Sequence, residues 1–320
     1  HSILSACEIG AGDEVILPSF TVPATIKPVV HLGATPVFAD INPRTMGLDA
    51  ETIEARRTAQ TRAVIAVYPY GLPIDIRAIQ SVCKRHDLAL IEDSCEALGT
   101  RVDSLHAGRH GIAGCFGFYP NKQITTGEGG MCITDDPELA STLRLIRNHG
   151  RDMSGIWMDQ QLCGHNFRLS ELQAALGVSQ LSRWSETQSR RARIAERYHV
   201  LLASDSRLRL PDHSQRGDDP VSLFSFPLNL NSTLPTNELR QTRDQIVASM
   251  LEKGIQCGRY FAPLHQQPTW CEDKVSLPET ERIAAGSIIL PFFNELRPEQ
   301  QEQVAECLTQ CLSSSTLTSD

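Results

Sequence analysis

The segment FYPNKQITTGEGG, residues 118–130, decides the interpretation of this chain. It continues an apolar run at 111–119 that is typical of a buried strand, and it places one lysine, Lys122, just before a glycine-rich turn. A lysine at the end of a buried strand is either a surface residue at a loop edge or a reactive amine beside a pocket. The rest of the sequence is needed to distinguish these two interpretations.

Strand-like and helix-like runs alternate through the first half of the chain. The expected strands cover residues 13–20, 34–41, 61–71, 88–95, 111–119 and 129–136, and the expected helices include 49–58, 74–87 and 137–150. The strand-like runs are short, rich in β-branched residues and apolar on both faces, which is typical of a sheet covered by helices on both sides. We therefore expect an α/β fold with a mostly parallel sheet.

The second half of the chain has a different pattern, in which helices predominate. Ser170 and Gln173 have the spacing of a capping box and predict the start of a helix. A long charged helix at about 185–204, a half-exposed strand at 221–230, an amphipathic helix at 238–254 and a final helix follow. This pattern predicts a large domain over residues 1–184, then a linking helix and a smaller α+β domain over residues 185–320.

Composition excludes several classes of protein. The chain has 320 residues, of which 41% are hydrophobic and 21% charged, and its net charge is −8. These values are ordinary for a globular protein and argue against nucleic-acid binding, which usually requires a basic face. The longest apolar runs are far shorter than the roughly 20 residues of a membrane span, and no signal peptide is visible. We expect a cytoplasmic protein without a membrane or nucleic-acid partner.

The ten cysteines are scattered, and none forms a CxxC pair or another metal-ligand spacing. The sequence therefore predicts no metal site. Cys83, Cys95, Cys115 and Cys132 lie within apolar segments, and we interpret them as small buried hydrophobic residues in a reducing compartment, not as disulfide partners.

Two residues that could take part in catalysis lie at the ends of expected strands. In a parallel α/β sheet, ligands bind beyond the carboxyl ends of the strands. Asp93 ends the run LALIED, and Lys122 follows the run at 111–119. Taken alone, Asp93 is more simply a turn cap, Lys122 a surface lysine and the glycine loop a plain turn. Together they match pyridoxal phosphate (PLP), which requires an amine for its aldehyde and an acid that keeps its ring nitrogen protonated.

Six segments of the chain resemble the DegT/StrS family of PLP-dependent aminotransferases, which act on keto groups of nucleotide sugars and related cyclitols. These segments are residues 12–21, 33–41, 68–76, 91–99, 118–130 and 164–181, in the family's order. The resemblance runs from about residue 1 to residue 311. It implies the type I fold of PLP-dependent transferases, with a mostly parallel seven-stranded large domain and a smaller α+β C-terminal domain. It also implies a homodimer with active sites at the subunit interface.

The resemblance also implies roles for individual residues. Lys122 matches the lysine that bonds to PLP and then serves as general base, and Asp93 matches the acid paired with the ring nitrogen. Asn166 matches an asparagine that the partner subunit lends to the cofactor phosphate. Arg168 is a candidate for holding an anionic group of the substrate. His265 matches a loop near the sugar site, and its simpler interpretation is a turn histidine bonded to the backbone.

Several positions depart from the family pattern. Glu96 stands where a glutamine often contacts the ring hydroxyl, and an ionised carboxylate accepts hydrogen bonds but donates none. Val22 stands where an aromatic side chain often stacks on the ring, so it can pack but not stack. Gly117 replaces a frequent serine. The chain starts at His1, just after the position of an SGT-type phosphate-binding segment, so we expect the N-terminal part of the large domain to be missing from this sequence.

The predicted function is transfer of an amino group, with glutamate as donor, to a keto group of a nucleotide-linked deoxysugar. Two alternatives are a cyclitol (inosose) aminotransferase and a non-catalytic or regulatory member of the family that lacks the phosphate-binding loop. A third is a PLP enzyme with another outcome, such as dehydration. Dehydrating relatives carry histidine at the position of Lys122, so this lysine favours amino transfer. The sequence does not name the sugar, the nucleotide or the carbon atom that receives the amine.

Overall fold

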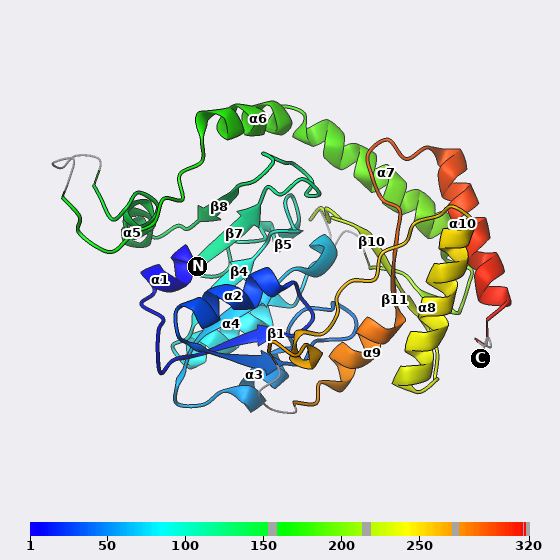
Figure 1. Cartoon of the computed structure of the whole chain (residues 1–320), viewed down its shortest axis with the longest axis horizontal. Helices are drawn as coiled ribbons and strands as arrows, with labels where there is room; N and C mark the ends of the chain where they lie inside the picture. The colour runs from blue at the N-terminus through cyan, green and yellow to red at the C-terminus, as the bar shows by residue number, and fades with distance from the viewer. Residues whose placement is uncertain (153–158, 213–218, 271–274, 316, 318–320) are drawn as a thin grey trace.

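The protein is an α/β structure in which helices cover both faces of a central sheet (Figure 1). The computed structural model describes residues 1–152, 159–212, 219–270, 275–315 and 317. The sheet and its helices occupy the first half of the chain, and a second, smaller sheet with its own helices occupies the second half (Figure 1). The expected α/β class is therefore confirmed.

The central sheet has six strands in the order β2-β1-β3-β4-β7-β8. Their bounds are β1 Glu14–Pro18, β2 Thr35–Ala39, β3 Thr61–Val67, β4 Ala89–Asp93, β7 Ala113–Gly117 and β8 Gly130–Ile133. All neighbouring pairs are parallel except β7 and β8. The sheet thus has one strand fewer than the seven implied by the resemblance, because no described segment pairs with the outer edge of β8.

Alternation along the strands sends side chains to two separate hydrophobic clusters. Val15 and Leu17 pack in one cluster and Ile16 packs in the other. The first cluster includes residues of α1 (Ser2–Ala6), α2 (Pro23–His31) and α5 (Pro137–Arg147); the second includes residues of α3 (Ala50–Arg56) and α4 (Ile76–Arg85). Both faces of the sheet are therefore covered, which explains why its strands are apolar on both sides.

A long helical segment leads from the large sheet to the second half of the chain. Helix α6 (Glu171–Leu181) begins with the predicted capping box between Ser170 and Gln173, and α7 (Trp184–Leu202) follows. The second half contains β9 Leu208–Arg209, β10 Phe226–Leu230, β11 Ser287–Leu290, α8 Thr236–Glu252, α9 Pro278–Gly286 and α10 Pro298–Ser313. We propose a domain boundary at the start of α7, between residues 184 and 185.

Strand β10 corrects one expectation about this second half. The segment 221–230 was expected to form a half-exposed strand, but the strand is shorter and all five of its residues are buried. It lies between β9 and β11 in an antiparallel sheet, and its apolar residues pack in a cluster with residues of α7, α8 and α10. Because both faces of β10 are buried, the alternation of apolar and polar residues in this segment does not indicate an exposed face.

The second half packs on the carboxyl ends of the central strands. Phe20, Ile41 and Tyr70 follow β1, β2 and β3, and all three belong to the cluster that contains the core of the second half. The Tyr70 ring stacks on Phe261 with ring centroids 5.2 Å apart, and the Tyr70 hydroxyl donates a hydrogen bond to the Tyr260 carbonyl. The edge of the sheet at which ligands are expected is thus bordered by both halves.

The cysteines only partly follow the expectation. The nine described cysteines are free, and Cys83 is buried as expected. Cys95 and Cys115 are half-buried and Cys132 is exposed, so these three are not the fully buried hydrophobic residues that the sequence suggested. Cys132 lies on β8, one of the two edge strands of the sheet. No helix within the described ranges has the length and apolar character needed to span a bilayer.

Candidate active site

A cavity of about 500 Å³ lies at the carboxyl ends of the central strands. Its lining includes Val22 after β1, Asp93 at the end of β4 and Lys122 after β7, together with Phe224 and Tyr260 from the second half of the chain. This volume is within the range of about 300–1,000 Å³ that is usual for small-molecule and cofactor sites. The position beyond the strand ends is the one expected for a ligand in a parallel sheet.

Lys122 is held inside this cavity. Its side chain is 15% exposed, and its Nζ lies 3.3 Å from Glu96 Oε1. The same Nζ lies 4.4 Å from the centre of the Phe224 ring, which adds a cation–π contact. The interpretation of Lys122 as a surface lysine is therefore wrong.

The glycine-rich segment after Lys122 forms the predicted tight turn. The Phe118 N–H donates to the Gly129 carbonyl, and the Thr126 N–H donates to the Phe118 carbonyl. Gly127 has a φ of +79°, a left-handed conformation in which a side chain would be strained. This turn fixes both ends of the loop that carries Lys122.

Glu96 is the partner of Lys122, and the sequence did not predict this contact. The carboxylate is buried, and its second oxygen accepts a hydrogen bond of 2.8 Å from the Tyr70 N–H. Burial raises the pKa of the Glu96 carboxyl, and the positive charge of Lys122 opposes this effect only in part. The pair therefore joins the lysine to a carboxylate that accepts a proton more readily than an exposed glutamate does.

Asp93 is oriented by short polar contacts. Its Oδ2 accepts a hydrogen bond of 2.9 Å from the Thr25 hydroxyl, and Thr25 itself lies 2.9 Å from the Thr21 hydroxyl. The other oxygen accepts a bond of 3.2 Å from the Cys95 N–H, so Asp93 also caps the turn after β4. Thr25 lies in α2, and no sequence signal pointed to it as a partner of Asp93.

Glu92 fixes the strand immediately before Asp93. Its side chain is fully buried and accepts hydrogen bonds from the Tyr68 hydroxyl at 2.6 Å and from three backbone N–H groups of the loop 108–111. Burial alone would raise the pKa of Glu92, but the hydrogen bonds from His110, Tyr68 and the loop backbone outweigh it, so the net pKa is lowered. In its charged form this carboxylate joins β4, which ends at Asp93, to the loop 108–111.

The other predicted site residues occupy different places. Val22 lines the cavity and is 38% exposed. Asn166 and Arg168 are exposed and lie outside the cavity lining; the Arg168 guanidinium donates to Asn148 Oδ1 at 2.8 Å. His265 is buried away from the lining, with Nδ1 2.6 Å from the Ser19 hydroxyl and Nε2 3.3 Å from a Glu281 oxygen.

Comparison with known proteins agrees with this geometry. Residues 1–309 match the DegT/DnrJ/EryC1/StrS aminotransferase family. The chain belongs to this family. Its fold is accordingly that of the PLP-dependent aminotransferases, and the resemblance seen in the sequence is confirmed.

Two of the curated relatives of this family member have the names of sugar-processing enzymes. It is 35% identical to GDP-perosamine synthase of Caulobacter vibrioides, across 98% of this chain and 82% of the relative. It is also 35% identical to UDP-N-acetyl-3-dehydro-alpha-D-glucosamine 3-aminotransferase of Acidithiobacillus ferrooxidans, across 97% of this chain and 80% of the relative. The crystal structure of NtdA from Bacillus subtilis, with bound cofactor PMP, has a TM-score of 0.86 at 26% identity, covering 98% of this chain and 70% of that one.

Proposed function

We propose that the protein uses PLP to move an amino group from glutamate to a keto group of a nucleotide-linked deoxysugar. The observation that carries this proposal is the placement of the Lys122 amine and the Asp93 carboxylate on one cavity of cofactor size beyond the strand ends. The names of the two sugar-processing relatives support the substrate class. The PMP bound to NtdA supports the cofactor.

The residues around the cavity fit PLP at two of its functional groups. Lys122 is a mostly buried amine that can hold the aldehyde, and Asp93 is a carboxylate that can hold the protonated ring nitrogen. Val22 offers an apolar surface for one side of the ring. When bound, PLP supplies an aldehyde that exchanges amino groups and a ring that withdraws electrons.

The chain's own groups provide proton transfer at Lys122. The amine must lose its proton before it reacts with a carbonyl group. Glu96 Oε1, 3.3 Å from the lysine Nζ, is placed to take that proton, and burial raises the pKa of this carboxyl. The neutral Nζ then acts as the general base, moving a proton within the substrate, while the Phe224 ring and the carboxylate limit its motion.

The described cavity lining offers little positive charge to a phosphate group. Among the described residues that line it, Lys122 is the one cationic side chain, and that amine is needed for the aldehyde. A phosphate dianion requires further hydrogen-bond donors. We propose that a second copy of this chain supplies Asn166, and that Arg168 on the same exposed segment holds an anionic part of the substrate.

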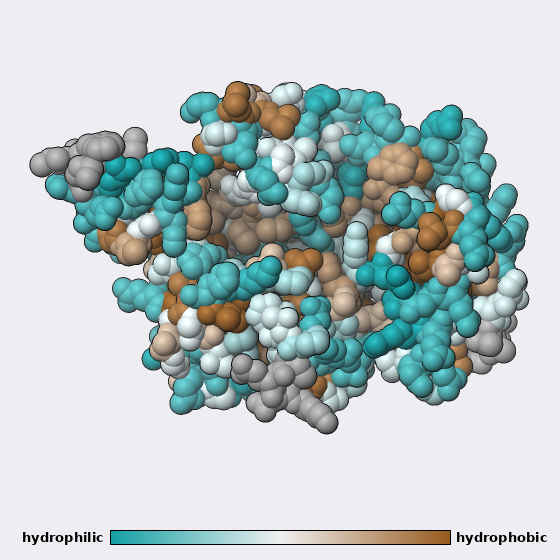
Figure 2. All heavy atoms as spheres, in the orientation of Figure 1, coloured by the Kyte–Doolittle hydropathy of each residue, from teal (hydrophilic) through white to brown (hydrophobic). Residues whose placement is uncertain are grey.

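An exposed apolar surface is available for that second copy. Helix α6 has no buried residue, although its sequence is largely apolar. Large apolar side chains of α6 and the segment before it are exposed: Phe167, Leu169, Leu172, Leu176, Val178 and Leu181. Figure 2 shows apolar side chains gathered over α6. Exposed apolar side chains in this number are typical of an interaction surface. Gln173 ties α6 to the Lys122 loop through a 2.8 Å hydrogen bond to the Glu128 carbonyl.

We expect Leu172→Asp to convert a dimer into monomers. Leu172 is 85% exposed in the single chain, and burying a leucine contributes about 1.5–3 kcal/mol, which a buried carboxylate would reverse. The dimer should therefore dissociate at least about 100-fold more readily, as measured by sedimentation equilibrium. Leu251→Asp is the matched control, because Leu251 is a 60% exposed leucine on α8. A variant Leu172→Asp that stays dimeric would place the interface elsewhere.

The proposed function is tested by loading the wild-type protein with PLP, desalting it and reducing it with borohydride. We expect covalent cofactor on the peptide that contains Lys122, identified by mass spectrometry. The unreduced protein should transfer ¹⁵N from labelled glutamate to keto sugars linked to GDP or UDP. Neither retained cofactor nor transfer would instead support the non-catalytic alternative, and transfer to an inosose alone would support the cyclitol alternative.

A further inference from the structure

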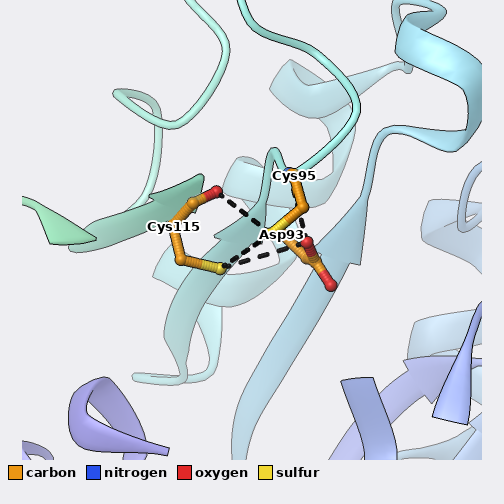
Figure 3. Close-up of side chains that lie close together, drawn as sticks. All are labelled: Asp93, Cys95 and Cys115. Atoms are coloured by element: carbon orange, nitrogen blue, oxygen red, sulfur yellow. Dashed lines mark hydrogen bonds between the residues drawn. The ribbon is translucent and has the colours of Figure 1, made fainter. Parts of the chain in front are cut away.

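Two cysteines and Asp93 meet beside the cavity, although they are separated in the sequence. Figure 3 shows the side chains of Asp93, Cys95 and Cys115 close together. Asp93 ends β4, Cys95 follows it in the loop, and Cys115 pairs with Asp93 from the middle of the neighbouring strand β7. The two Sγ atoms are 3.9 Å apart, and Cys115 Sγ lies 4.0 Å from Asp93 Oδ1. The ligand atoms of all three residues lie within 4.8 Å of one another. The fold thus assembles a set of donor atoms that no sequence spacing predicts.

The distances between these donor atoms are close to the ligand–ligand distances of a tetrahedral zinc site. Zn–S bonds of about 2.3 Å and Zn–O bonds of about 2.1 Å give S···S and S···O separations of about 3.8 Å and 3.6 Å in a tetrahedron. The observed separations are 3.9 Å and 4.0 Å. A disulfide bond, in contrast, requires sulfur atoms about 2.0 Å apart, so the two thiols would have to approach each other by nearly half their present separation. The geometry favours a bridging cation over a disulfide.

We propose that Asp93, Cys95 and Cys115 form a binding site for a thiophilic divalent cation of the zinc class. The cation would bind two thiolates and one carboxylate, and the two thiol protons would leave to solvent. The fourth position would be open to the cavity, because Asp93, Cys95 and Gly117 all line it.

Two thiolates and one carboxylate are a ligand set that suits a thiophilic divalent cation. A divalent cation replaces the thiol proton, and the Asp93 charge that opposes a bare thiolate attracts the cation.

The site overlaps the cofactor cavity at two of its three residues, Asp93 and Cys95. Asp93 would be a ligand of the cation and also, under the proposed function, the acid that holds the PLP ring nitrogen. The cation and the cofactor should therefore exclude each other, and free zinc should block cofactor loading of the apoprotein. This exclusion rests on the proposed function, whereas the metal site rests on the side-chain geometry alone.

The test is a titration of the reduced, chelator-treated full chain with Co²⁺, which reports thiolate ligands by a sulfur-to-cobalt charge-transfer band. We expect one Co²⁺ per chain, displaced by Zn²⁺. Cys95→Ser and Cys115→Ser should each weaken binding by at least about 100-fold, because loss of an outer-shell partner alone costs about 10–100-fold. Cys132→Ser is the matched control, since Cys132 pairs directly with Cys115 in the sheet but lies outside the set. Circular dichroism checks that each variant is folded.

Each outcome has a definite consequence. Co²⁺ binding that survives in folded Cys95→Ser and Cys115→Ser, or that is lost in Cys132→Ser, overturns the site. Protein loaded with PLP and reduced by borohydride should bind Co²⁺ at least about 10-fold more weakly than the apoprotein; equal binding overturns the exclusion. If the chain binds Co²⁺ through both cysteines but takes up no cofactor, the metal site stands and the proposed function fails.

Discussion

Lys122→Ala is expected to abolish both covalent cofactor retention and amino transfer. The variant removes the amine that holds the aldehyde and the base that moves the substrate proton. General-base catalysis alone contributes about 10²–10⁴-fold, so we expect turnover with glutamate to fall by more than about 10⁴-fold. The measurement is ¹⁵N transfer from glutamate, with borohydride trapping in parallel.

Two further variants separate chemistry from stability at this position. Lys122→Arg keeps a cation next to Glu96 but cannot form the covalent bond, so it should fold like wild type and remain inactive. Lys84→Ala is the control, because Lys84 is an exposed lysine on α4, and its activity should stay within about twofold of wild type. Amino transfer by folded Lys122→Ala at a rate near that of wild type would contradict the assignment of Lys122.

Glu92→Gln is expected to cause the largest loss of stability. Both Glu92 oxygens accept hydrogen bonds, from His110 and Gly111 backbone groups on one side and from Tyr68 and Gly108 on the other. An amide turns one of these acceptors into a donor that faces other donors. Disrupting a buried charged network of this kind costs about 3–5 kcal/mol, measured as the free energy of unfolding in urea.

Two matched variants test whether the hydrogen-bond network of Glu92 causes this loss of stability. Tyr68→Phe removes only one hydrogen bond to the charged group and should cost about 1.5–3 kcal/mol. Glu252→Gln, on the exposed end of α8, should change stability by less than about 0.5 kcal/mol. A Glu92→Gln protein as stable as the Glu252→Gln protein would show that the network does not hold the strand.

The pH dependence of stability carries the same signature. The folded pKa of Glu92 is lowered relative to its unfolded value of about 4.3. Its contribution is therefore fully present above about pH 4.3 and is lost as the pH falls through the lower, folded pKa. Urea unfolding between neutral pH and pH 3 should show a smaller loss for Glu92→Gln than for wild type.

The sequence predicted the position of the site better than its internal contacts. Asp93 and Lys122 were recognised because the carboxyl ends of parallel strands share one edge of the sheet. The ion pair of Lys122 with Glu96 and the meeting of Cys95 with Cys115 depend on strand register and on rotamers, which no local pattern encodes. The six strands of the sheet were found from their apolar runs. The full burial of β10 was missed because its covering helices come from distant segments.

The predicted roles of Asn166 and His265 illustrate a second limit. Asn166 is exposed and outside the cavity lining, so its proposed role requires a second copy of the chain. His265 is bound through both ring nitrogens, to Ser19 and Glu281. These contacts favour a structural histidine, but its ring bonds to side chains and not to the backbone as the simpler interpretation expected. Family position alone did not distinguish these two uses of a histidine.

The packing of Phe20, Tyr70 and Phe261 has a consequence for cooperativity. These aromatic side chains lie within 5.2–6.1 Å of one another between ring centres, and they come from both halves of the chain. Neither half can expose this core without disturbing the loops that follow β1 and β3, which also form part of the cavity wall. Heat should therefore melt both halves in one calorimetric transition, and cofactor capacity should disappear at the same temperature.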